Sequence, residues 1–222
     1  MEQEESCERC GKPRAVCVCD RIEPLASRVR VLVLQHPQED DVVLGTARLV
    51  SLTLPEHARI ARGLSWASLE HAIETAGWSP EGIDRERWAV LAAAKLPEGL
   101  SEDVRARPVL VLDRKGRVRE RDAAPIEGLV VLDGTWSQAK TLWWRNPWLL
   151  KLSRVVLRPR EPSMYGKLRR EPRREWVSTL EAIADALPAL GEPEATRDAL
   201  RRALRTMLQR ARDAQAAEER TR

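Results

Sequence analysis

Gly128-Leu-Val-Val-Leu-Asp133-Gly-Thr-Trp136-Ser-Gln138 is the stretch of this 222-residue sequence that decides the fold. It opens with a glycine and four aliphatic residues, as expected for a strand buried on both faces of a parallel sheet. Thr135 precedes Gln138 by three positions, which fits a capping box and predicts that a helix begins here. The strand therefore turns abruptly into a helix, and Asp133 lies at the strand tip beside exposed backbone N–H groups.

Outside this stretch, apolar runs with high β-propensity alternate with segments of helical periodicity. The predicted strands are 29–34, 58–61, 88–92, 109–112 and 154–157, and the predicted helices are 45–54, 66–76, 100–107, 135 to about 146, 178 onward, and 194 to about 217. Strands that alternate with helices imply an α/β fold with a mostly parallel sheet.

Polar side chains follow the first predicted strand directly, as Gln35, His36 and Glu39. Ligands of open parallel sheets bind at the carboxyl ends of the strands, which makes His36 and Glu39 candidate site residues. A solvated loop is the alternative interpretation of the same residues.

All four cysteines lie within the first 19 residues, spaced as Cys7-Glu-Arg-Cys10 and Cys17-Val-Cys19. The acidic, polar start of the chain and the lack of a long apolar run predict a cytoplasmic protein that does not enter a membrane. Because thiols stay reduced in the cytoplasm, the cluster indicates a zinc knuckle rather than disulfides, with a redox site as the alternative. Four thiolates leave no open coordination position, so the zinc is expected to be structural.

Basic residues outnumber acidic residues by 38 to 34, and most of the basic residues are arginine. The excess concentrates between Arg154 and Glu175, where eight basic residues accompany three acidic ones and Tyr165 is available to stack on a base. Guanidinium groups suit RNA phosphates, although a GC-rich genome would enrich arginine without any function. The segment 158–175 is therefore a candidate RNA-binding loop.

Taken together, the ordered motifs resemble the signature of the DTW-domain family. The resemblance rests on the cysteine cluster, Leu34-Gln-His-Pro37 with Glu39, Gly45-Thr46, Asp133-Gly-Thr-Trp136, Ser163 and Tyr165 before Arg169 and Pro172, and Ser178-Thr-Leu-Glu-Ala182. These motifs extend over residues 7–182. The segment 113–122 belongs to none of them.

For the fold, the resemblance implies a SPOUT-like domain with helices on both faces of the sheet and a C-terminal trefoil knot. The expected parts are a zinc knuckle at 1–24, a catalytic domain at 25–190, and a C-terminal helix at 191–222 that packs on the domain or extends it. A monomer and a homodimer both stay open, since SPOUT proteins often dimerise through the knot.

For the function, the resemblance implies that S-adenosylmethionine donates its 3-amino-3-carboxypropyl group to N3 of a uridine, most often in tRNA. Two other functions stay open. One is a SPOUT methyltransferase that uses the same donor, and the other is a zinc-containing RNA-binding protein without catalysis. A sharp strand-to-helix turn that carries polar side chains favours catalysis over binding alone.

Transfer to uridine N3 requires removal of the imide proton. Asp133 is the candidate general base, with binding of the donor's ammonium group or stabilisation of the turn as alternatives. His36 is a second candidate base, because an imidazole exchanges protons near neutral pH.

The remaining motif residues are candidates for binding the donor or the RNA. Helix capping is the alternative role for Thr135 and Ser178, and core packing is the alternative for Trp136. The residues expected to bind S-adenosylmethionine are Gln35, Glu39, Thr135, Trp136, Ser178, Thr179 and Glu181, and those expected to bind RNA are Tyr165, Arg169, Arg170, Arg173 and Arg174.

Overall fold

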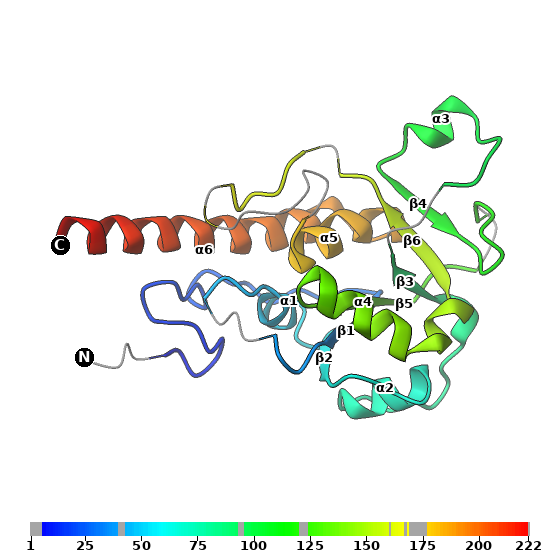
Figure 1. The fold of residues 1–222 in the computed structure, drawn as a ribbon, viewed down its shortest axis with the longest axis horizontal. Helices are drawn as coiled ribbons and strands as arrows, with labels where there is room; N and C mark the ends of the chain where they lie inside the picture. Colours follow the sequence, from blue (N-terminus) through cyan, green and yellow to red (C-terminus); the bar gives the residue numbers. More distant parts are fainter. Residues whose placement is uncertain are drawn as a thin grey trace.

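One six-stranded sheet organises the chain in the computed structural model (Figure 1). The structure describes residues 6–39, 43–92, 96–119, 124–159, 161–166, 168 and 177–221. The strands are ordered β2-β1-β5-β3-β6-β4 across the sheet. Their bounds are β1 Arg30–Gln35, β2 Ala58–Arg62, β3 Trp88–Leu91, β4 Val109–Leu112, β5 Gly128–Asp133 and β6 Ser153–Leu157.

Within the part of the chain that is described, the strand pairings are parallel except at one edge, where β4 runs antiparallel to β6. The strand of the opening motif, β5, lies inside the sheet between β1 and β3. That position buries both of its faces, which is the physical reason for the aliphatic run from Leu129 to Val131. The prediction of an α/β fold with a mostly parallel sheet is confirmed.

The helices match the predicted ones except in length. The predicted helix at 100–107 is a single turn, and the last helix reaches beyond its predicted end. The helices are α1 Ala47–Thr53, α2 Leu69–Thr75, α3 Glu102–Arg105, α4 Trp136–Arg145, α5 Thr179–Ala186 and α6 Glu194–Thr221, with 3₁₀ turns η1 Arg85–Arg87, η2 Pro147–Lys151 and η3 Leu187–Leu190.

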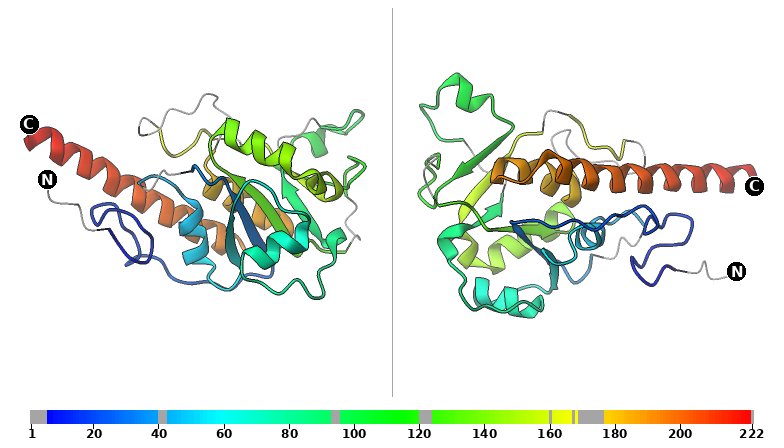
Figure 2. Two further views of the ribbon diagram at one scale, coloured as in Figure 1. Left: turned by 60° about the horizontal axis from the view of Figure 1, so that its bottom comes forward. Right: turned by 180° about the vertical axis from the view of Figure 1, so that it is seen from behind.

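Helices cover both faces of the sheet, as expected (Figure 2). Alternate residues of β1 show the two layers, because successive side chains of a strand point to opposite faces. Val31 and Val33 belong to the core that also contains side chains of α1, α5 and α6. Leu32 and Leu34 belong to a second core with side chains of α2 and α4.

Gly128 begins β5 because a larger residue would not fit there. A Cβ atom at this position would lie 2.2 Å from the indole of Trp88 on the neighbouring strand β3. The two residues are partners in the parallel register, so the tryptophan fills the space that the glycine leaves.

The C-terminal helix α6 packs against α1 and α5, with Leu204 and Met207 fully buried. Val16 and Val18 of the cysteine-rich N-terminal segment join the same core. Among the described residues, none of the helices combines the length and the apolar character that a membrane crossing demands.

Candidate active site

Two polar side chains predicted from different motifs meet at the carboxyl edge of the sheet. Gln35 at the end of β1 and Asp133 at the end of β5 are partners in the parallel register. The Gln35 amide Nε2 donates a hydrogen bond to Asp133 Oδ2 at 2.8 Å. The backbone N–H of His36 donates to the Asp133 carbonyl at 3.0 Å, which extends the pairing by one residue.

A third motif reaches the same carboxylate from the first turn of α5. The Thr179 hydroxyl donates to Asp133 Oδ1 at 2.5 Å. Asp133 is only 7% exposed. Each of its two carboxylate oxygens accepts one hydrogen bond from a neighbouring element. Since a carboxylate oxygen accepts two hydrogen bonds, each oxygen retains capacity for a ligand.

The first turn of α4 is built by the predicted capping box. The Thr135 hydroxyl accepts a hydrogen bond from the backbone N–H of Gln138, and Gln138 Oε1 accepts one from the backbone N–H of Thr135 at 2.7 Å. Gly134 has φ +145°, and a Cβ there would lie 2.8 Å from Gln138 Oε1, so only glycine fits this turn. Trp136, the first residue of the helix, is 55% exposed beside the site.

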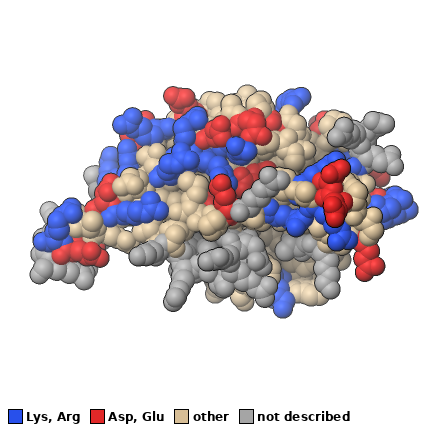
Figure 3. Space-filling model, turned by 90° about the horizontal axis from the view of Figure 1, so that it is seen from above, with Lys and Arg blue, Asp and Glu red and all other residues tan. Residues whose placement is uncertain are grey.

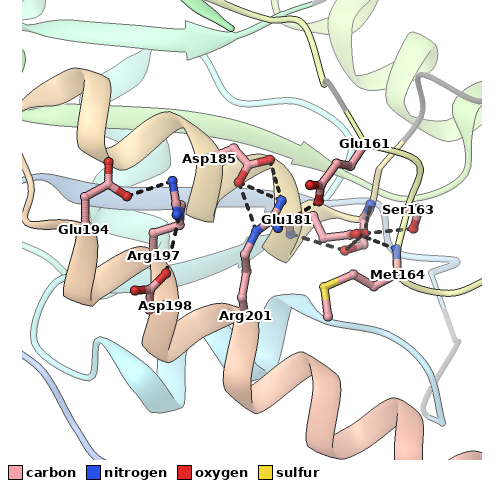
Figure 4. Close-up of polar contacts among 10 residues, drawn as sticks. Glu161, Ser163, Met164, Glu181, Asp185, Glu194, Arg197, Asp198 and Arg201 are labelled. Atoms are coloured by element: carbon pink, nitrogen blue, oxygen red, sulfur yellow. Dashed lines mark hydrogen bonds and ion pairs between the residues drawn. The ribbon is translucent and has the colours of Figure 1, made fainter.

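The first turn of α5 contains a second capping box, but its Glu181 is 1% exposed (Figure 4). The Glu181 carboxylate accepts hydrogen bonds from the Ser178 N–H at 2.9 Å, the Ser178 hydroxyl at 2.8 Å and the Ser163 hydroxyl at 2.9 Å. It also accepts one from the backbone N–H of Met164 at 2.7 Å. Four protein donors enclose this carboxylate, so Glu181 fastens residues 163–164 to α5 and does not face a ligand, contrary to its predicted role.

A neighbouring ion pair joins α5 to α6 in the same region. Arg201 of α6 donates two hydrogen bonds to Asp185 of α5, at 3.1 and 3.0 Å (Figure 4). The Arg201 guanidinium also lies 3.7 Å from the Glu161 carboxylate. The C-terminal helix therefore braces the helix that positions Thr179.

The structure corrects the prediction for Tyr165. This side chain is buried in the core beneath α1 and α5, and its hydroxyl donates a hydrogen bond to the carbonyl of Leu44. Its ring is not available to stack on an RNA base. The four predicted RNA-binding arginines, Arg169, Arg170, Arg173 and Arg174, lie outside the described residues.

The buried His36 ring lies one residue beyond Gln35, but its geometry does not suit a proton acceptor. Its Nδ1 accepts a hydrogen bond from the backbone N–H of Gln38 at 3.2 Å. The neutral ring then has its proton on Nε2, so neither nitrogen retains a free lone pair. Glu39 follows in the same turn, where its N–H donates to the His36 carbonyl at 2.9 Å.

The four N-terminal thiols converge as predicted and can hold a metal ion. All four sulfur atoms lie within 4.8 Å of one another, and none forms a disulfide. Sulfur atoms about 3.8 Å apart suit tetrahedral coordination with metal–sulfur bonds of about 2.3 Å, and the Cys7–Cys19 and Cys10–Cys17 pairs are 3.8 and 3.6 Å apart. Hydrogen bonds from the Cys10 backbone and the Cys17 side chain lower the pKa of Cys7 to about 6, whereas desolvation by burial raises the pKa of Cys17 and of Cys19.

Sequence reasoning missed a lysine that connects this cluster to the site. Lys12 is 1% exposed, and its ammonium group donates to the carbonyls of Val43 at 2.9 Å and Gly45 at 2.7 Å. The next residue, Thr46, accepts a hydrogen bond at its hydroxyl from the backbone N–H of Leu180 at 3.2 Å. The cysteine turn, the start of α1 and the start of α5 are therefore linked, and the only signal in the sequence was the position of Lys12 between the cysteine pairs.

The sequence model of the DTW domain matches residues 4–212, which is nearly the whole chain. The chain belongs to the DTW-domain family. The Asp133, Thr135 and Trp136 that give the family its name lie together at the carboxyl edge of the sheet in this DTW domain.

Three curated relatives share the name tRNA-uridine aminocarboxypropyltransferase 2. The mouse (Mus musculus) protein is 27% identical over 210 residues, covering 93% of this chain and 63% of the relative. The Macaca fascicularis protein is 26% identical, covering 90% of this chain and 61% of the relative. The Drosophila melanogaster protein is 28% identical, and the match covers 90% of this chain and 72% of the relative. This DTW domain thus spans less than two thirds of the length of the mouse and macaque relatives. No solved structure matches it.

Proposed function

We propose that this protein transfers the 3-amino-3-carboxypropyl group of S-adenosylmethionine to N3 of a uridine in tRNA. The observation that carries the proposal is the convergence of three family motifs on one carboxylate. Gln35, Thr179 and Asp133 come from segments far apart in the sequence and share two hydrogen bonds. The curated relatives that the chain matches are named tRNA-uridine aminocarboxypropyltransferase 2.

The groups at the site fit S-adenosylmethionine, which carries an ammonium group, a carboxylate and a purine. Asp133 has unused acceptor capacity for a cation, and the exposed Trp136 indole offers a face for the purine. Hydroxyls at Thr135, Ser178 and Thr179 and the polar Gln35 and Glu39 are the proposed further contacts of the donor. The solvent-exposed start of α4 suits its carboxylate. When bound, S-adenosylmethionine supplies an electrophilic carbon beside a sulfonium, with methylthioadenosine as the leaving group.

We assign Asp133 the task of receiving the imide proton of uridine. Hydrogen bonds from Gln35 and Thr179 fix the orientation of this carboxylate, so that its free acceptor positions point in a defined direction. His36 is the weaker candidate because its Nδ1 is already an acceptor for Gln38. The arginines at 169, 170, 173 and 174 are proposed to contact RNA phosphates.

Zinc is the proposed occupant of the four-cysteine cluster, in a structural role, because four thiolates complete a tetrahedral shell. A reducing compartment such as the cytoplasm suits four free thiols. The SPOUT-like knot belongs to the same proposal. The position of β5 between β1 and β3, and the hydrogen bonds from Tyr165 to Leu44 and from Leu180 to Thr46, support it.

The proposed reaction is tested with bulk tRNA and S-adenosylmethionine labelled either in the methyl group or in the carboxypropyl portion. Transfer of only the carboxypropyl label supports the proposal. Label that arrives only from the methyl group makes the protein a methyltransferase, and RNA binding without transfer makes it a binding protein.

The role of Asp133 is tested by Asp133→Asn, which retains the shape of the side chain. Loss of a proton acceptor lowers kcat by about 100-fold or more, with S-adenosylmethionine affinity retained in calorimetry. A loss of donor affinity with little change in kcat would instead assign Asp133 to the ammonium group.

A further inference from the structure

Trp144, near the end of α4, is the most exposed of the large apolar side chains in the described part of the chain. It is 72% exposed, although indoles are usually well buried. Trp136 at the start of the same helix is also exposed, whereas Leu142 on its other side is fully buried in the core. Figure 2 shows α4 as an outer layer of the molecule.

Trp136, Lys140 and Trp144 follow one another at intervals of four residues and are all exposed. Residues at this spacing lie on one side of a helix, about 6 Å apart along its axis. We call this set the α4 stripe. It begins beside Asp133 and leads away from the site by about 12 Å.

The charged side chains of α4 and of the turn that follows it, η2, are all basic. Between Asp133 and Glu161 the sequence has six basic residues and no acidic one. Lys140 and Arg145 of α4 and Lys151 of η2 are exposed. The face that is seen from above in Figure 3, by contrast, mixes basic and acidic side chains. The α4 stripe therefore suits a negatively charged partner that also presents flat apolar surfaces.

RNA has both properties, because its bases stack on aromatic rings while its phosphates pair with cations. A second copy of this chain fits less well. A two-fold interface through α4 would bring the same lysine and arginine of both copies against each other. The proximity of the α4 stripe to Asp133 also places an RNA bound there next to the site.

We propose that Trp144 stacks on an unpaired base of the tRNA next to the target uridine, while Lys140 and Arg145 contact the flanking phosphates. This inference rests on the proposed function, since it takes tRNA as the substrate. Trp136 remains assigned to the purine of S-adenosylmethionine. The α4 stripe therefore contacts the donor at its Trp136 end and the RNA at its Trp144 end.

Trp144→Ala in the full-length, metal-loaded protein tests the inference. We expect it to raise the Kd for a fluorescently labelled, unmodified tRNA transcript about tenfold, the usual order for loss of one stacked base. Affinity for S-adenosylmethionine, measured by calorimetry, stays unchanged. Trp144→Phe retains an aromatic ring and is expected to raise the Kd less than about threefold.

Leu150→Ala is the matched control, because Leu150 is 51% exposed on the adjoining turn η2 but has no ring. It is expected to bind tRNA as the unchanged protein does. Lys140→Ala is expected to reduce the slope of log affinity against log salt by about one, whereas Trp144→Ala leaves that slope unchanged.

Unchanged tRNA affinity of Trp144→Ala would overturn the inference. So would a loss of self-association in sedimentation of the RNA-free Trp144→Ala protein with tRNA affinity retained, which would assign the α4 stripe to a second copy. If no label is transferred but Trp144→Ala still weakens tRNA binding, the proposed function fails and the RNA surface stands. If transfer proceeds and Trp144→Ala binds normally, the RNA surface alone fails.

Discussion

The first turns of α4 and α5 are built by the same capping box, yet one is open to solvent and the other is enclosed. At α4, Thr135 is exposed and the box ends in an uncharged Gln138. At α5, the box ends in Glu181, whose buried carboxylate accepts hydrogen bonds from four protein donors. The enclosed turn holds Thr179 rigidly over Asp133, whereas the open turn leaves its surface for ligands. The same local sequence signal thus produces an enclosed turn at α5 that positions Thr179 and a solvent-exposed turn at α4 that is accessible to ligands.

The largest difference between the two turns is expected in stability. Glu181→Ala leaves several buried donors without an acceptor and is expected to lower the free energy of unfolding by about 3 kcal/mol. Gln138→Ala removes half of an exposed cap and is expected to cost about 1 kcal/mol or less. Urea unfolding at pH 7 measures both. Equal losses of unfolding free energy in the two variants would contradict the distinction between the enclosed turn of α5 and the exposed turn of α4.

A smaller effect is expected on the chemistry. Thr179→Val removes one of the two donors to Asp133, and we expect kcat to fall about tenfold because the carboxylate loses its orientation. Thr179→Ser retains the hydroxyl and is expected to restore most of the rate. The labelled transfer assay measures both variants, and a rate as low for serine as for valine would contradict the prediction, because the hydroxyl alone would then not sustain the rate.

The support of α5 also extends to the cysteine turn through Lys12. Lys12→Met keeps the aliphatic stem but removes the hydrogen bonds to Val43 and Gly45. We expect a loss of about 1–2 kcal/mol in unfolding free energy. Hydrogen exchange is expected to rise at amides 46–50 and 180–183 and to stay constant at 139–145 of α4. Faster exchange in α4 alone would break the proposed link.

The smallest effect concerns an ion pair on the α4 side of the sheet, where Arg85 lowers the pKa of Glu70 of α2 to about 2. A carboxyl whose pKa is lowered on folding contributes stability above its unfolded pKa of about 4.3, and this contribution is lost as the pH falls towards 2. Because the pair is partly exposed, the contribution is below about 1 kcal/mol. Urea unfolding of Glu70→Gln is expected to differ from the unchanged protein at pH 7 and to converge with it near pH 2.

The sheet and both capping boxes were predictable because apolar runs and caps are local patterns. The meeting of Gln35 with Asp133 followed from strand ends that share one edge of a parallel sheet. The roles of Glu181 and Tyr165 were not predictable, because each depends on which distant segment lies opposite. A glutamate at the third position of a helix looks the same whether water or a folded loop supplies the remaining donors. Lys12 was missed for the same reason, since its acceptors lie 31 and 33 residues away.

The shared core of the N-terminal segment and α6 also affects how the protein is made. Arg210 of α6 donates two hydrogen bonds to Asp20 at 2.8 Å, and Val16 and Val18 lie in one core with Met207. At about 5–20 residues per second of synthesis, α6 leaves the ribosome roughly 10–40 s after Val18. The cysteines are therefore available to a metal before the helix that will cover their segment exists. Metal uptake during translation would therefore keep the cysteine segment folded until α6 is synthesised and packs against it.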